Sequence, residues 1–281
     1  MALLHRHRAI TVGFLLSGLV LAPQPVCAEL SANELLRKVI DNELNAQAQD
    51  HSHWMYVRRT EIPGEQEKET EREIIQSKDG DLDRLLSVNG QALTAGQAMR
   101  EDERIQKLLK NPSEQQKLER DREQDNRETE RLLKMLPEAF IARYAERRGE
   151  LVELTFSPNP NFRPSSHEEQ VFHAMEGRIW IASKESRLAE IEGHLTNAVR
   201  FLGGLLGHLD KGGQFHVKQS EVAPGHWEIT AMNINMRGKA LFFKTIDVRQ
   251  NETRTSFQRV PDDLTLAQAA ERLKAGVFKR T

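Results

Sequence analysis

The chain has 281 residues and a mass of 32.1 kDa, and 38% of its residues are hydrophobic while 29% are charged. That length allows one large domain with a continuous core, and the composition excludes a polytopic membrane protein. Forty Lys and Arg residues against 42 Asp and Glu residues give a net charge of −2, so no basic field favours nucleic acid as a partner. A single cysteine excludes an intrachain disulfide and a multi-cysteine metal site.

The first 28 residues predict an export signal. Two arginines, Arg6 and Arg8, precede an apolar run over residues 9–22, which is too short to cross a bilayer as a helix. Val26 and Ala28 are the small residues of a cleavage site, whereas the residues before Cys27 do not fit a lipoprotein signal. We therefore expect cleavage after Ala28 and a periplasmic mature protein with no cysteine and no stable transmembrane segment. An uncleaved membrane anchor is the less favoured alternative.

Residues 32–48 predict a helix, because leucine, valine and isoleucine repeat there at helical spacing and Ser31 or Asn33 can cap its first turn. The period then changes to that of extended chain. Turn signals such as Asn89-Gly90 separate or close three such stretches. They predict an antiparallel meander with strands over residues 54–62, 67–77 and 82–88.

A charged helical insertion is predicted over residues 94–148. About half of residues 100–148 are charged, and residues 119–131 include no apolar side chain. We expect helices whose apolar ends contact the body of the protein while the charged middle stays in solvent. A nucleic-acid-binding arm is disfavoured, because acidic residues alternate with the basic ones.

The remaining chain predicts short strands separated by Gly and Pro turns, with a helical turn over residues 167–175. The strands are expected over residues 151–156, 178–183, 188–195, 214–222, 226–236, 240–249 and 251–259. A closing helix over residues 266–275 is capped by Asp262, Asp263 and Thr265. This order predicts an α+β fold: one domain over residues 29–281, in which a curved antiparallel half-barrel of about eight or nine strands wraps around helices.

The motifs that could carry catalysis or metal binding are incomplete. His167 and His173 lie six residues apart and not the four of a zinc-protease helix, and His51 and His53 have no third ligand. The glycines of residues 203–213 lack the ending of a phosphate-binding loop. We therefore predict no catalytic residue, no metal site, no cofactor and no enzymatic activity. A hydrolase that uses His167, His173 or His226 is the weakest alternative.

Apolar side chains on the later strands allow two interpretations. They can form an ordinary core, or they can line a hollow that a strongly curved sheet leaves unfilled. The periodicity does not separate the two. The predicted ligand-lining residues are Trp180, Ile181, Phe215, Trp227, Met236 and Phe243.

The C-terminal half resembles the LolA/LolB-like superfamily of outer-membrane lipoprotein-sorting proteins. The resemblance rests on Gly-Arg-Ile-Trp-Ile at residues 177–181, on residues 187–193, on Trp227, on Gly-Lys-Ala-Leu-Phe-Phe-Lys at residues 238–244 and on residues 256–257. It implies an exported half-barrel covered by helices, whose concave face receives acyl chains. The charged segment is longer than the lid of a simple carrier of this kind.

Together these observations predict an exported, non-catalytic binding or carrier protein. Its ligand would be a lipid, a lipoprotein acyl chain or another hydrophobic molecule. The alternative is a periplasmic protein-interaction or regulatory module, in which the charged insertion recognises an envelope protein.

Overall fold

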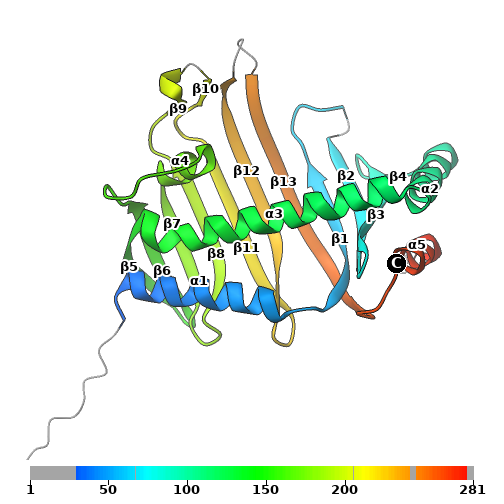
Figure 1. Cartoon of the computed structure of the whole chain (residues 1–281), viewed down its shortest axis with the longest axis horizontal. Helices are drawn as coiled ribbons and strands as arrows, with labels where there is room; N and C mark the ends of the chain where they lie inside the picture. Colours follow the sequence, from blue (N-terminus) through cyan, green and yellow to red (C-terminus); the bar gives the residue numbers. More distant parts are fainter. Residues whose placement is uncertain (1–29, 67, 205, 241–244, 277–281) are drawn as a thin grey trace, which may run out of the picture.

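The computed structural model describes residues 30–66, 68–204, 206–240 and 245–276, and these residues form one large antiparallel sheet with helices on it (Figure 1). The predicted signal segment therefore lies outside the described residues. The helices are α1 (Ala32–Gln49), α2 (Ala95–Leu109), α3 (Pro112–Ala139), α4 (His167–His173) and α5 (Leu266–Ala275). The strands are β1 (His53–Glu61), β2 (Glu69–Ser77), β3 (Gly80–Val88), β4 (Gln91–Ala92), β5 (Phe140–Arg148), β6 (Leu151–Pro158), β7 (Met175–Ala182), β8 (Arg187–Leu195), β9 (Val199–Phe201), β10 (Gly207–Leu209), β11 (Gln214–Ala223), β12 (His226–Ala240) and β13 (Thr245–Val260).

The strands lie side by side in the order β4-β3-β2-β1-β13-β12-β11-β8-β7-β6-β5, and the short strand β10 joins β9 to β12. The sheet does not close into a barrel, because β4 and β5 are its two opposite edges. The predicted α+β class with a curved antiparallel sheet is confirmed. The first and the last strand of the described chain, β1 and β13, pair in the middle of the sheet.

One face of the sheet, called the concave face here, is crossed by α1 and α3 (Figure 1). The main core lies between these helices and β5 to β8, where Leu36 of α1, Leu136 of α3 and Ile179 of β7 are all buried. Helix α1 begins as its sequence predicts: Ser31 and Glu34 form a reciprocal capping box around the first turn. The predicted first helix is confirmed.

A second core lies under α5, which packs on strands β2 and β3. Its strand residues include Met55, Ile75 and Leu82, which are direct cross-strand neighbours, and Leu273 of α5 is buried in the same core. The strand register places Met55 on the face opposite to that of α1 and α3, so α5 covers part of the outer face. The closing helix is confirmed, with Thr265 and not an aspartate as its N-cap.

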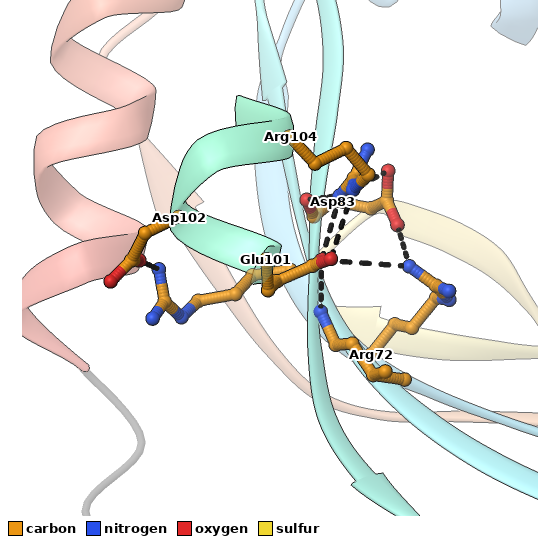
Figure 2. Close-up of polar contacts among 7 residues, drawn as sticks. Arg72, Asp83, Glu101, Asp102 and Arg104 are labelled. Carbon is orange, nitrogen blue, oxygen red and sulfur yellow. Dashed lines mark hydrogen bonds and ion pairs between the residues drawn. The ribbon is translucent and has the colours of Figure 1, made fainter. Parts of the chain in front are cut away.

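Helix α2 covers the edge of the sheet beside β3. Glu101 of α2, labelled in Figure 2, accepts a hydrogen bond from the backbone N–H of Leu85, with an N···O distance of 2.7 Å. Arg104 also binds Glu101 (Figure 2), and Arg84 of β3 pairs with Asp102 at 2.6 Å. An edge strand with unpaired backbone groups invites pairing with other chains. The carboxylate of Glu101 accepts a hydrogen bond from one such backbone N–H group and so anchors α2 at this edge.

Glu73 makes the stability of this region depend on pH. The side chain is only 1% exposed, and burial raises its pKa to about 7 although Arg84 lies directly opposite and lowers it. Between about pH 4.3, where an unfolded glutamate titrates, and about pH 7, the folded chain holds a proton that the unfolded chain has lost. The free energy of unfolding therefore falls as the pH rises through this window, and stays low above it.

We expect Glu73→Gln to remove this dependence and to raise the free energy of unfolding at pH 8 by about 1–3 kcal/mol. Urea unfolding of both proteins at pH 5 and pH 8 measures it. The exposed Glu61, which lies on neighbouring strand β1, provides the control Glu61→Gln. Equal pH profiles for the wild type and Glu73→Gln would show that the buried carboxyl does not titrate in this window.

Two boundaries of the predicted elements are wrong. The helical insertion predicted over residues 94–148 ends at Ala139, and Phe140–Arg148 forms the edge strand β5. Its first residues alternate between buried and exposed, and pairing with β6 outweighs the charged composition that suggested a helix. The break expected between the predicted strands over residues 226–236 and 240–249 is also absent at residues 237–239, because β12 continues to Ala240.

Gly238 does not form a turn. It allows the backbones of strands β10 and β12 to lie very close together. A Cβ atom at this position would lie 2.1 Å from the carbonyl oxygen of His208, because β10 pairs with β12 there. Only a glycine fits such a contact.

The two strands predicted over residues 240–259 correspond to the single strand β13, which begins at Thr245. The structure describes thirteen strands, and the short strands β4, β9 and β10 were among those missed.

Candidate functional site

The structure places the six predicted ligand-lining residues in different environments, and one of them, Phe243, lies outside the described residues. Ile181 is fully buried in the main core. Trp180, its neighbour, points to the outer face, where the Arg148 guanidinium lies 4.8 Å from the ring centroid. Neither side chain faces an open part of the concave face.

The other three predicted residues are half-buried. Phe215 of β11 and Met236 of β12 pack at the margin of the main core, on the concave face. Trp227 lies near the β11–β12 turn, beneath the Arg187 guanidinium, which is 5.6 Å from its ring centroid. The structure therefore brings Phe215 and Met236 to one surface and leaves Trp227 at the end of the sheet.

An apolar surface that we call the β12 strip continues from these two residues. Phe215 pairs with Ile234, and Val217 pairs with Met232, so their side chains share one face of β11 and β12. All are half-buried, and Met232 and Ile234 belong to neither of the two cores in the described chain. The strip comprises Phe215, Val217, Met232, Ile234 and Met236.

The middle of α3 supplies no apolar cover for this strip. The helix crosses the whole concave face (Figure 1), but its buried residues, which run from Met135 to Ala139, all lie in its last turns. Its two ends contact α1 and β5 on one side and α2 and β3 on the other. Residues 119–131 contain no apolar side chain that could pack down on the sheet. The strip is thus spanned by a polar helix.

The concave face becomes charged on the strands beyond the strip. Met232 pairs with Glu252 of β13, which is buried and accepts a hydrogen bond of 2.7 Å from Arg254. The Arg254 guanidinium also lies 5.5 Å from the centroid of the Tyr56 ring. Burial raises the pKa of the Tyr56 phenol, so this group is neutral at physiological pH. An apolar surface and a charged surface therefore adjoin on the concave face.

The histidines considered for a hydrolase have separate partners. His226 stacks on Trp54 with ring centroids 4.1 Å apart, and its two ring nitrogens lie 2.7 Å from Asp50 and 3.2 Å from Glu228. Burial raises the pKa of the Glu228 carboxyl. His173 contacts the carbonyl oxygen of Asn159. The His226 cluster joins the end of α1 to β12, and both of its nitrogens face carboxylates, so it lacks the arrangement of an activated nucleophile.

A groove of about 830 Å³ lies on the outer face of the sheet. Its lining includes one lateral row of outward-facing polar side chains that continues from β5 to β13: Arg143, Thr155, Arg178, Glu192, His216, Asn233 and Asn251. Many of these groups bind one another, as Asn233 and Asn251 do at 3.0 Å. Ile141, Phe156, Phe215 and Ile234 also line the groove. The polar row itself is unsuited to a hydrocarbon chain, because its groups would lose their hydration without compensation.

Two general features of the described residues complete the site description. No three or more His, Cys, Asp or Glu side chains among them gather as a metal ion would require. None of their helices has the length and the apolar character needed to cross a membrane.

Comparisons with known proteins give only weak similarities. No family model matches the chain, and no curated protein matches it. A LolA superfamily protein from Nitrosomonas europaea is 9% identical, with 83% of this chain and 96% of that chain covered and a TM-score of 0.28. A DUF1329 family protein from Desulfovibrio piger is 11% identical, with 80% and 92% covered and a TM-score of 0.24. Scores this low do not support an argument about function, which rests on the residues of this chain.

Proposed function

We propose that this protein is an exported, non-catalytic binding or carrier protein, and that an apolar chain of its ligand lies on the β12 strip beneath α3. The ligand class is that of a lipid or a lipoprotein acyl chain. The observation that carries the proposal is the half-buried position of Met232 and Ile234 on the concave face, outside both cores and under a helix segment with no apolar side chain.

The size of the strip suits one acyl chain. From Met232 to Met236 the strand advances about 13 Å, since each residue of a strand adds about 3.3 Å. One leaflet of a bilayer is about 15 Å of hydrocarbon, which is half of the total thickness. Each buried CH₂ group would contribute about 0.8 kcal/mol, so a chain that covers the strip could bind without any covalent chemistry.

A pair of neighbouring substitutions on β12 tests this proposal. We expect Ile234→Gln to weaken binding of dansyl hexadecylamide, a neutral single-chain probe, by about tenfold, because a polar amide would be desolvated under the chain. Asn235→Gln changes the next residue, which faces the outer side, and should leave the dissociation constant unchanged. Probe fluorescence in a titration measures both. The proposal fails if the wild type shows no saturable binding, or if both variants lose it equally.

The exposed part of α3 is the basis of the alternative, a protein-interaction module. Its charges pair within the helix, as in Lys117 with Asp121 at 2.8 Å and Glu119 with Arg122 at 2.6 Å. Such pairs stabilise an exposed helix and leave few free charges to attract a partner. The ligand-binding function is therefore favoured, and recognition of an envelope protein stays a prediction that deletion of residues 113–130 would test.

A further inference from the structure

Three arginines lie side by side on the concave face, on β13, β1 and β2. Arg254 pairs with Arg58, and Arg58 pairs with Arg72 in the strand register. The arginines on either side of Arg58 have carboxylate partners: Arg254 binds Glu252, and Arg72 binds Asp83. Within the described chain, Arg58 between them makes no hydrogen bond or ion pair, and its Nε atom is buried without an acceptor.

This arrangement is unfavourable for a protein without a ligand. Like charges directly opposite on neighbouring strands destabilise a sheet, and a buried guanidinium N–H without an acceptor loses its hydration. The Tyr56 phenol, which lies on the same face two residues before Arg58, is neutral and does not compensate the charge. An anion bound between Arg58 and Arg254 would supply both the missing acceptor and the missing charge.

The unpaired arginine lies close to the apolar surface. Arg58 pairs with Arg254, and Glu252, two residues before Arg254, pairs with Met232 of the β12 strip. From β12 to β1 there are two strand-to-strand steps, or about 10 Å. A molecule with a hydrocarbon chain and an anionic end could therefore contact both surfaces at once.

We propose that Arg58, together with Arg254, binds the anionic head group of a single-chain amphiphile, a carboxylate or a phosphate, whose hydrocarbon tail occupies the β12 strip. This inference rests on the proposed function and adds the chemical class of the ligand. The guanidinium groups of two arginines suit such oxyanions, because their N–H groups match the spacing of the oxygens.

The test compares ligands that differ only in the head group. Palmitate, hexadecyl phosphate and neutral 1-hexadecanol are titrated as competitors of dansyl hexadecylamide. We expect the wild type to bind the two anionic ligands at least tenfold more tightly than the alcohol. Arg58→Gln should abolish this preference without changing the affinity for the alcohol, and Arg58→Lys should retain part of it. Arg59→Gln is the matched control, because Arg59 points to the other face and pairs with Glu69 at 2.6 Å.

The outcomes separate this inference from the proposed function. Equal wild-type affinities for palmitate and hexadecanol would overturn the head-group site and leave the carrier proposal intact, and this comparison needs no variant to fold. Binding of none of the probes would overturn the proposed function itself. Inorganic phosphate and acetate alone are the last competitors: if phosphate bound as tightly as hexadecyl phosphate, the site would recognise a free anion and not an amphiphile.

Discussion

Gly177→Ala is expected to destabilise the fold by at least about 3 kcal/mol, which is at the upper end of overpacking effects. A Cβ atom on Gly177 of β7 would lie 1.9 Å from the carbonyl oxygen of Glu192 on β8 and 2.8 Å from the Cα of Gly193. Because both atoms belong to the backbone, no side-chain rotation can relieve the contact. Either the β7–β8 pairing shifts or the sheet loses its curvature at this point. Urea unfolding followed by circular dichroism measures the loss.

Gly96→Ala is the matched control for this prediction. Gly96 lies in the first turn of α2, and a Cβ atom there would meet only the end of the Arg100 side chain, at 3.9 Å. Alanine is the better helix former by up to about 1 kcal/mol, so this variant should unfold at an equal or higher urea concentration. A Gly177→Ala protein as stable as the wild type would contradict the close strand contact on which the curved sheet depends.

Glu43→Gln is expected to lower the free energy of unfolding by about 3 kcal/mol, because it breaks a buried ion pair between α1 and β8. Glu43 is 7% exposed and accepts two hydrogen bonds from Arg187, each 2.9 Å long, and a third of 2.6 Å from the backbone N–H of Leu188. Without the carboxylate, the Arg187 guanidinium would remain buried and unpaired. The same ion pair holds Arg187 over Trp227.

The control comes from an exposed ion pair on the same helix. Arg37 of α1 pairs with Glu138 of α3, and both side chains are about half exposed or more. We expect Glu138→Gln to change stability by less than about 1 kcal/mol, as is usual for a surface pair. Chemical unfolding of the two variants side by side gives the comparison. Equal effects of Glu43→Gln and Glu138→Gln would show that burial does not strengthen the first pair.

The helices and the first strands could be predicted because local signals are strong there. Ser31 with Glu34 and Thr265 with Gln268 form capping boxes that mark the starts of α1 and α5. The turn signal Asn89-Gly90 ends β3, and both residues have positive φ angles. These features act within a few residues, so the sequence alone is enough to identify them.

Strand β5 and the course of β12 could not be predicted in the same way. The nine residues of β5 include Arg143, Arg147 and Arg148, and only pairing with β6 makes them a strand. Glycine is a residue type typical of turns, but Gly238 lies within β12, where the absence of a side chain leaves room for the backbone of His208. Both outcomes depend on segments that are distant in sequence or on contacts that no local pattern encodes.

The candidate site was only partly predictable for a related reason. Trp180 and Ile181 are adjacent on a strand and therefore face opposite sides, which excludes a single lining for both. The alternation of Met232, Ile234 and Met236 with Asn233 and Asn235 is the pattern that could have indicated one apolar face on β12. Sequence cannot show whether a helix fills that face. It also cannot show that Arg58 is unpaired, since its neighbour Arg254 is contributed by the other end of the chain.

Photo-crosslinking with a diazirine-labelled palmitate tests the central claim most directly, since it locates the chain on the protein. After irradiation, mass spectrometry of proteolytic fragments identifies the modified residues. We predict labels on Met232 or Ile234 of β12 and on residues 119–131 of α3, and their loss when unlabelled palmitate is added in excess. Labels on the outer groove, at residues such as His216 or Asn233, or labels that excess palmitate does not displace, would contradict a hydrocarbon-binding concave face.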